Sequence, residues 1–120
     1  MNITMIYPEN ATNKTKYDLA MSPKAQKLSD CKGQRIELAA YCTYMDEKTD
    51  KQGNATGEVQ EILSVMTPEG EIYSTNSATC IRELHKMIEL FGMDEITAVE
   101  IIPGTSKAGR EFITLAYAGE

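Results

Sequence analysis

The alternation of apolar and polar residues divides most of the chain into extended segments. Residues 35–45 alternate regularly, which predicts a long strand. One face of that strand carries Ile36, Leu38, Ala40, Cys42 and Tyr44. Extended character returns over residues 59–67 and, after the turn Pro68-Glu69-Gly70, over residues 72–74. The pattern therefore predicts a long strand followed by a β-hairpin.

Between Ser77 and Phe91 the apolar period changes to that of a helix. The apolar residues are spaced by three, four and three, and they form one stripe that faces the core: Ile81, Leu84, Ile88 and Phe91. Asn76 or Ser77 can cap the N-terminus of this helix, and Gly92 can end it. Residues 96–102 and 110–117 then read as two strands joined by a glycine-containing loop.

The N-terminal residues carry a weaker pattern. Residues 1–16 are rich in Asn, Thr and Lys with little periodicity, which predicts a flexible arm. Order is expected to begin at Tyr17, because Tyr17, Leu19 and Met21 alternate as in a short accessory strand. Residues 17–120 are then expected to form a single OB-like domain.

After the accessory strand the predicted order is three strands, one helix and two strands. An OB-fold is a five-stranded, partly open barrel, and its helix commonly lies between strands three and four. The sequence therefore predicts a mainly-β, OB-fold-like five-stranded barrel with one helix. Other small α+β sandwiches share this order of elements.

Composition and charge fit one domain but complicate a nucleic-acid function. A chain of 120 residues with 42% hydrophobic residues can close one core. The net charge is −6, whereas a basic surface is the usual sign of nucleic-acid binding. Residues 1–35 hold six basic and three acidic side chains, a net charge of +3, so the remainder carries −9. The basic third is either a solvated arm or one edge of a binding groove.

Several function classes lack the residues that they require. Cys31, Cys42 and Cys80 are an odd number without paired spacing, which favours reduced thiols. Cys80 and His85 are five apart and no C-x-x-C occurs, so neither a metal nor another cofactor is expected. His85 is the only histidine and no nucleophile–base set can be assembled, which predicts a non-enzymatic protein. The absence of an apolar span or signal segment predicts a cytoplasmic protein that does not enter a membrane.

Candidate nucleic-acid contacts come from one loop and a few aromatic residues. The loop from Gly104 to Arg110 has the glycine spacing of a phosphate loop, but a strand follows it in place of a helix. Lys107 and Arg110 are therefore either phosphate contacts or parts of an ordinary hairpin loop. Lys48 and Lys51 add cations to another exposed connection.

The aromatic residues are candidate stacking platforms for bases. Tyr41 and Tyr44 lie three apart on one strand, so they face opposite sides and one of them is expected outside the core. Tyr73 lies on a neighbouring strand, and Phe112 or Tyr117 can add to the same surface. The alternative for each tyrosine is partial burial with a solvated hydroxyl.

Several short segments resemble a known family. Residues 69–74 and 102–112, with the helix between them and, more loosely, the strand at residues 35–44, run in the order and spacing of the single-stranded-DNA-binding proteins of small Bacillus-type phages with protein-primed replication. Over residues 35–117, the resemblance implies sequence-nonspecific binding and protection of single-stranded DNA during phage DNA replication, in the host cytoplasm. It implies contacts by Tyr73 and, less closely matched, by Tyr41 or Tyr44. Lys107 and Arg110 match only as polar or basic loop neighbours.

Two alternatives and several questions stay open. An acidic phage or mobile-element protein could bind a host protein, as an inhibitor or a nucleic-acid mimic, without binding DNA. A structural module would bind neither. Self-association, contacts with phage replication proteins and the role of residues 1–34 are not decided by the sequence.

Overall fold

Two open β-sheets and two α-helices make up the fold that the computed structural model describes for residues 2–119. One sheet has the order β1-β4-β5-β6-β2 and the other β3-β7-β8. The elements are β1 (Asn2–Tyr7), α1 (Asn13–Ala20), β2 (Gln26–Lys27), the 3-10 helix η1 (Leu28–Cys31), β3 (Arg35–Glu37), β4 (Ala40–Thr49), β5 (Ala55–Met66), β6 (Ile72–Thr75), α2 (Ala78–Phe91), the 3-10 helix η2 (Met93–Glu95), β7 (Ala98–Thr105) and β8 (Glu111–Tyr117). The fold is thus mixed α/β, with more helix than the sequence predicts.

The long strand predicted over residues 35–45 is divided between the two sheets. β3 pairs with β7 in the three-stranded sheet, and β4 pairs with β5 in the five-stranded sheet. At the transition, the backbone N–H of Leu38 donates to the carbonyl oxygen of Thr97 at 2.9 Å, and that of Ala39 donates to Met66 at 2.8 Å. Consecutive residues therefore bond to the residue before β7 and to β5, and the chain passes from one sheet to the other within two residues.

The predicted hairpins and the second helix are confirmed. β5 pairs antiparallel with β6 across the turn at residues 67–70, and β7 pairs with β8. α2 begins after Ser77, whose hydroxyl accepts a hydrogen bond from the Cys80 backbone, and it ends at Gly92 with a φ of 86°. Phe91 is 38% exposed and stacks on Tyr117 at 4.2 Å, so its predicted core position is wrong. The apolar stripe of α2 is therefore buried in its earlier turns and exposed at Phe91 in its last turn.

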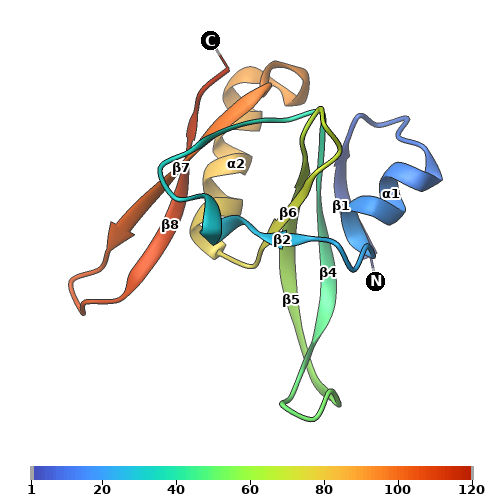
Figure 1. The fold of residues 1–120 in the computed structure, drawn as a ribbon, viewed down its shortest axis with the longest axis vertical. Helices are drawn as coiled ribbons and strands as arrows, with labels where there is room; N and C mark the ends of the chain where they lie inside the picture. Colours follow the sequence, from blue (N-terminus) through green and yellow to red (C-terminus); the bar gives the residue numbers. More distant parts are fainter. Residues whose placement is uncertain (1, 120) are drawn as a thin grey trace.

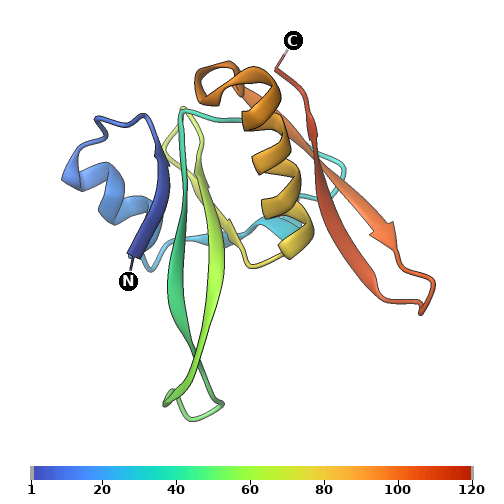
Figure 2. The same ribbon diagram turned by 180° about the vertical axis from the view of Figure 1, so that it is seen from behind.

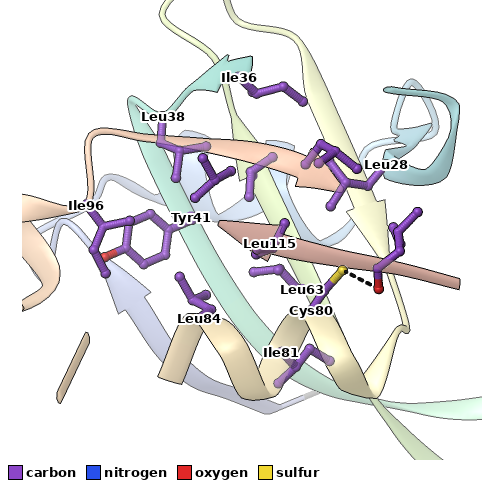
Figure 3. Packing of buried hydrophobic residues seen from close by; sticks show 14 of the residues in the cluster. Leu28, Ile36, Leu38, Tyr41, Leu63, Cys80, Ile81, Leu84, Ile96 and Leu115 are labelled. Atoms are coloured by element: carbon purple, nitrogen blue, oxygen red, sulfur yellow. Dashed lines mark hydrogen bonds between the residues drawn. The ribbon is translucent and has the colours of Figure 1, made fainter. Parts of the chain in front are cut away.

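The main core lies between the two sheets and α2 (Figure 3). Tyr41 is fully buried there, and its hydroxyl donates to the Met93 carbonyl at 2.7 Å, so its polar atom is satisfied. Leu84 of α2 and Leu115 of β8 belong to the same cluster. Figure 2 shows α2 lying between the hairpins β4–β5 and β7–β8. The helix thereby packs against both sheets.

The N-terminal segment adds an edge strand and a helix to the five-stranded sheet. β1 pairs antiparallel with β4, where the sequence predicts a flexible arm. The accessory strand predicted from Tyr17 is wrong, because α1 occupies this region and is capped by Thr12. Only Leu19 of the alternating residues is buried. It packs in a second cluster with Ala40, Cys42, Tyr44 and Ile72. The predicted mobility of residues 1–16 stays a prediction, and residues 1 and 120 lie outside the described range.

Candidate nucleic-acid interface

Two hairpins diverge from the body of the protein, and an N-terminal segment lies between them. In Figure 1 the hairpins β4–β5 and β7–β8 point in different directions, and β2 and η1 pass in front of their bases. β2 is fixed by parallel pairing with β6, where Gln26 is the partner of Tyr73. η1 is anchored by the buried side chains of Leu28 and Cys31. This pairing brings part of the basic N-terminal third to the space between the hairpins.

A continuous groove runs across this side of the molecule. It consists of three hollows, and each shares lining residues with the next. The first is lined by Ala25, Lys27, Ser29, Tyr44, Gln60, Ile62, Ser74, Thr75 and Asn76. The second is lined by Ser29, Lys32, Thr75, Asn76, Ser77, Glu111, Phe112 and Ile113. The third is lined by Lys32, Pro103, Gly104, Thr105, Glu111 and Phe112. We call these residues together the front groove.

Phe112 supplies an accessible aromatic ring in the front groove. Its side chain is 39% exposed, and its register partner on β7 is Gly104. A Cβ atom on Gly104 would lie 2.5 Å from Cζ of the Phe112 ring, so the ring lies directly over the glycine. The absence of a side chain at position 104 therefore sets where the ring lies. The ring is supported from β7 and remains open to solvent.

The two tyrosines of β4 face opposite sides of the sheet, as their spacing predicts, but both are buried. Tyr41 is 0% exposed in the main core, and Tyr44 is 7% exposed in the second cluster. Burial raises the pKa of both phenol groups. The prediction that one of them is exposed is wrong, because the N-terminal segment packs against the face that the sequence leaves free. Tyr44 still lines the floor of the front groove.

Tyr73 is half-buried and lies apart from the front groove. Its ring packs against the main core, and its hydroxyl donates to Glu71 Oε2 at 2.9 Å. This hydrogen bond to a carboxylate raises the pKa of the Tyr73 hydroxyl. Tyr73 is not among the lining residues of the groove. The structure therefore does not bring Tyr73 together with Phe112.

The predicted cations lie at the hairpins. Lys107 and Arg110 are exposed in the β7–β8 loop, which the Arg110 backbone N–H closes by donating to Ser106 Oγ at 3.1 Å. Lys51 is exposed at the tip of β4–β5. Lys48 Nζ lies 3.8 Å from Glu58 Oε2 on the same hairpin. The four cations thus belong to the two projecting arms rather than to the groove floor.

Sequence reasoning missed two lysines that line the front groove itself. Lys27 lies on β2 and Lys32 directly follows η1; both are exposed. Lys32 Nζ lies 3.6 Å from Glu111 Oε2, beside Phe112. The only sequence signal for them is the charge of +3 over residues 1–35. Two of the six basic residues of this third therefore line the groove.

Neither a metal site nor a membrane helix is found in the described chain. Over residues 2–119, no group of three or more His, Cys, Asp or Glu side chains could hold a metal ion. None of the described helices is long and apolar enough to cross a membrane.

Comparison with known proteins gives one family. A family model described as Phage Single-stranded DNA-binding protein matches residues 8–118. Neither the curated proteins nor the solved structures include a match. The matched range contains α1, α2, every strand after β1 and the whole front groove.

Proposed function

We propose, from the premise that the chain belongs to the phage single-stranded DNA-binding protein family, that the bound strand lies in the front groove. The family binds single-stranded DNA during phage DNA replication and is not a family of enzymes. DNA binding is therefore the function of this chain. The alternative of an acidic interaction protein without DNA binding disagrees with this membership. The location of the strand on the protein is our proposal.

The order of strands supports an open OB-like barrel. When β3 and β4 are counted as one bent strand, it pairs with β5 on one side and β7 on the other. Five strands then follow one another with α2 after the third. α2 bridges to β8, because Ser77 Oγ and Cys80 Sγ donate to the Ile113 carbonyl at 3.3 and 3.5 Å. OB-folds bind oligonucleotides on strands two and three and on the loops L12 and L45. Here these are β5, β6 and the two hairpin tips.

The chemistry of the front groove suits a single strand of any sequence. The exposed Phe112 ring can stack on a base, which is worth about 1–3 kcal/mol and does not depend on base identity. Lys27 and Lys32 line the groove, and Lys107 and Arg110 extend from its β7–β8 side, where they can contact phosphates. Glu111 partly neutralises Lys32. We therefore expect a shallow salt dependence with stacking as the larger contribution.

The observation that carries the proposal is the Phe112 ring, so its removal is the main test. Fluorescence anisotropy with a labelled oligo-dT of about 20 nucleotides measures the affinity. Phe112→Ala and Phe112→Leu are both expected to weaken binding by about 5- to 150-fold, the equivalent of 1–3 kcal/mol. Leucine keeps an apolar side chain over Gly104 but has no aromatic face. Equal affinities of wild type and both variants would place the strand elsewhere and leave the family function intact.

The matched aromatic control is Tyr17→Ala. Tyr17 is 51% exposed on α1 and does not line the groove. Its removal is expected to leave the affinity unchanged. Thermal unfolding of each variant distinguishes loss of a contact from loss of fold.

The groove lysines are tested by the slope of affinity against salt. Each phosphate contact to a single strand contributes about −0.7 to the slope of log K against log salt concentration. Lys27→Ala together with Lys32→Ala is expected to make the slope shallower by about 1.4. Lys86→Ala is the control, because Lys86 is exposed on α2, is paired with Glu83 and does not line the groove. An unchanged slope in the double variant would exclude this wall of the groove from phosphate contact.

A further inference from the structure

A further hollow lies between β5 and α2, on the other side of the five-stranded sheet from the front groove. It has a volume of about 430 Å³. Its polar lining residues are Lys48, Gln60, Glu61, Asn76, Arg82 and His85. We call it the rear hollow. The buried side chain of Ile81 also lines it.

The charges of the rear hollow favour an anion. The lining cations are Arg82 and Lys48, of which Lys48 Nζ also lies 3.8 Å from Glu58 Oε2, and the single lining carboxylate is that of Glu61. Glu61 Oε2 lies 3.7 Å from His85 Nε2, so this carboxylate is held against the histidine. Arg82 has no ion-pair partner within residues 2–119. A guanidinium without a carboxylate partner, in a hollow with amide donors beside it, matches the geometry of a phosphate group.

The rear hollow and the front groove meet at one ridge. Gln60 and Asn76 line both of them. The Asn76 side-chain amide donates to Gln60 Oε1 at 3.1 Å, which joins the end of β6 to β5. These two side chains are therefore common to both surfaces.

We propose that a bound single strand longer than the front groove crosses the Gln60–Asn76 ridge and places backbone phosphate in the rear hollow, against Arg82 with Lys48 and His85. This inference rests on the proposed location of the strand in the front groove. Glu61 opposes the contact by its charge and limits its strength. The rear hollow thus extends the binding site around the edge of the sheet for long strands only.

The test compares two lengths of oligo-dT, about 6 and about 20 nucleotides, because the shorter one can fill the groove without reaching the rear hollow. Arg82→Ala is expected to leave the affinity for the short strand unchanged. It is expected to weaken binding of the long strand by about 3- to 10-fold at low salt and to make the salt slope shallower by about 0.7. Glu61→Gln is expected to strengthen binding of the long strand alone, a gain that misfolding cannot produce.

Lys14→Ala is the charge control, because Lys14 is exposed on α1 and lines neither surface. Equal effects of Arg82→Ala on both lengths, or no effect on either, would overturn the inference. So would a long-strand affinity that Glu61→Gln leaves unchanged. Phe112→Ala lowers the affinity for both lengths if the strand lies in the front groove. Its result therefore separates failure of the rear hollow from failure of the proposed function.

Discussion

The two projecting hairpins are built from similar strands but differ in what their tips can do. β7–β8 keeps buried residues close to its tip, since Ile113 lies only three positions after Arg110. β4–β5 is longer, and all of residues 46–59 are exposed. Its tip region carries Lys48 and Lys51 but also several carboxylates: Asp46, Glu47, Asp50 and Glu58. The tip of β7–β8, residues 106–110, carries Lys107 and Arg110 and no acidic residue.

This difference shows how an acidic protein can bind a polyanion. The net charge of −6 says little about binding, because Lys107 and Arg110 are grouped in a loop that contains no acidic residue. Rigid attachment to the core also lowers the entropy lost when a side chain contacts DNA. The β7–β8 hairpin combines both advantages. We therefore expect it to contribute more to DNA binding than the longer β4–β5 hairpin does.

Among changes that compare the two hairpins, the largest expected effect comes from reversing the charges of the β7–β8 tip. Lys107→Glu with Arg110→Glu is expected to weaken binding of a short oligo-dT by about 10- to 100-fold, because two attractions to phosphate become repulsions. Lys48→Glu with Lys51→Glu makes the same charge change on β4–β5, and it is expected to weaken binding by less than about 5-fold, since carboxylates already surround these lysines. Anisotropy titrations measure both. Equal losses would remove the proposed difference between the hairpins.

A smaller effect is expected from the glycine beneath the Phe112 ring. Gly104→Ala places a methyl group 2.5 Å from the ring position, so the ring must move from its place over β7. We expect about a 3- to 10-fold loss of affinity with little change in stability, because the ring can swing toward solvent. Gly104→Ala added to Phe112→Ala is expected to cause no further loss. A further loss in the double variant would show that Gly104 acts in some way other than positioning the ring.

The sequence predicted the elements whose patterns are local. The spacing of Ile81, Leu84 and Ile88 predicted α2, and the Pro68-Glu69-Gly70 turn predicted the β5–β6 hairpin. β1 was missed because its partner β4 lies almost forty residues further along, and no local pattern reports such pairing.

The errors at the candidate site have the same physical origin. One of Tyr41 and Tyr44 was expected outside the core because a strand with one covered face alternates in burial. Side chains of α1 and β1 pack against the second face of β4 as well, so both tyrosines are buried. Lys27 was missed because only the parallel pairing of β2 with β6 brings it to the groove. Phe112 was among the candidates, but its support by Gly104 follows from strand register.

One buried cysteine lies near the base of each hairpin, and the pKa of its thiol reports how strongly its surroundings disfavour charge. Burial raises the pKa of Cys42, on β4, from 9.0 to about 12. Burial also raises the pKa of Cys80, whose Sγ donates to the Ile113 carbonyl on β8. A hydrogen bond with the Ser77 side chain acts against this rise by lowering the pKa of Cys80. A thiol whose pKa is raised in the folded state stabilises the fold fully below pH 9.0, and this contribution is lost as the pH rises toward 12.

The free energy of unfolding is therefore expected to fall by up to about 1.4 kcal/mol per pH unit above about pH 9 for each such thiol. Urea unfolding at several pH values measures this slope. Cys42→Ala is expected to flatten it more than Cys80→Ala does. If Cys80→Ala flattened the slope more than Cys42→Ala, the ionised thiol would be more strongly disfavoured at Cys80 than at Cys42.

The smallest effect is expected from shortening the β4–β5 hairpin. Glu47 and Val59 are register partners, so residues 48–58 can be replaced by an Asn-Gly turn without changing the pairing below them. Because the removed residues are all exposed, the melting temperature is expected to stay within a few degrees of wild type. Affinity for an oligo-dT of about 6 nucleotides is expected to change by less than about twofold. A large loss for this short strand would show that the long hairpin contacts DNA in the front groove itself, and the two hairpins would then be equal partners in binding.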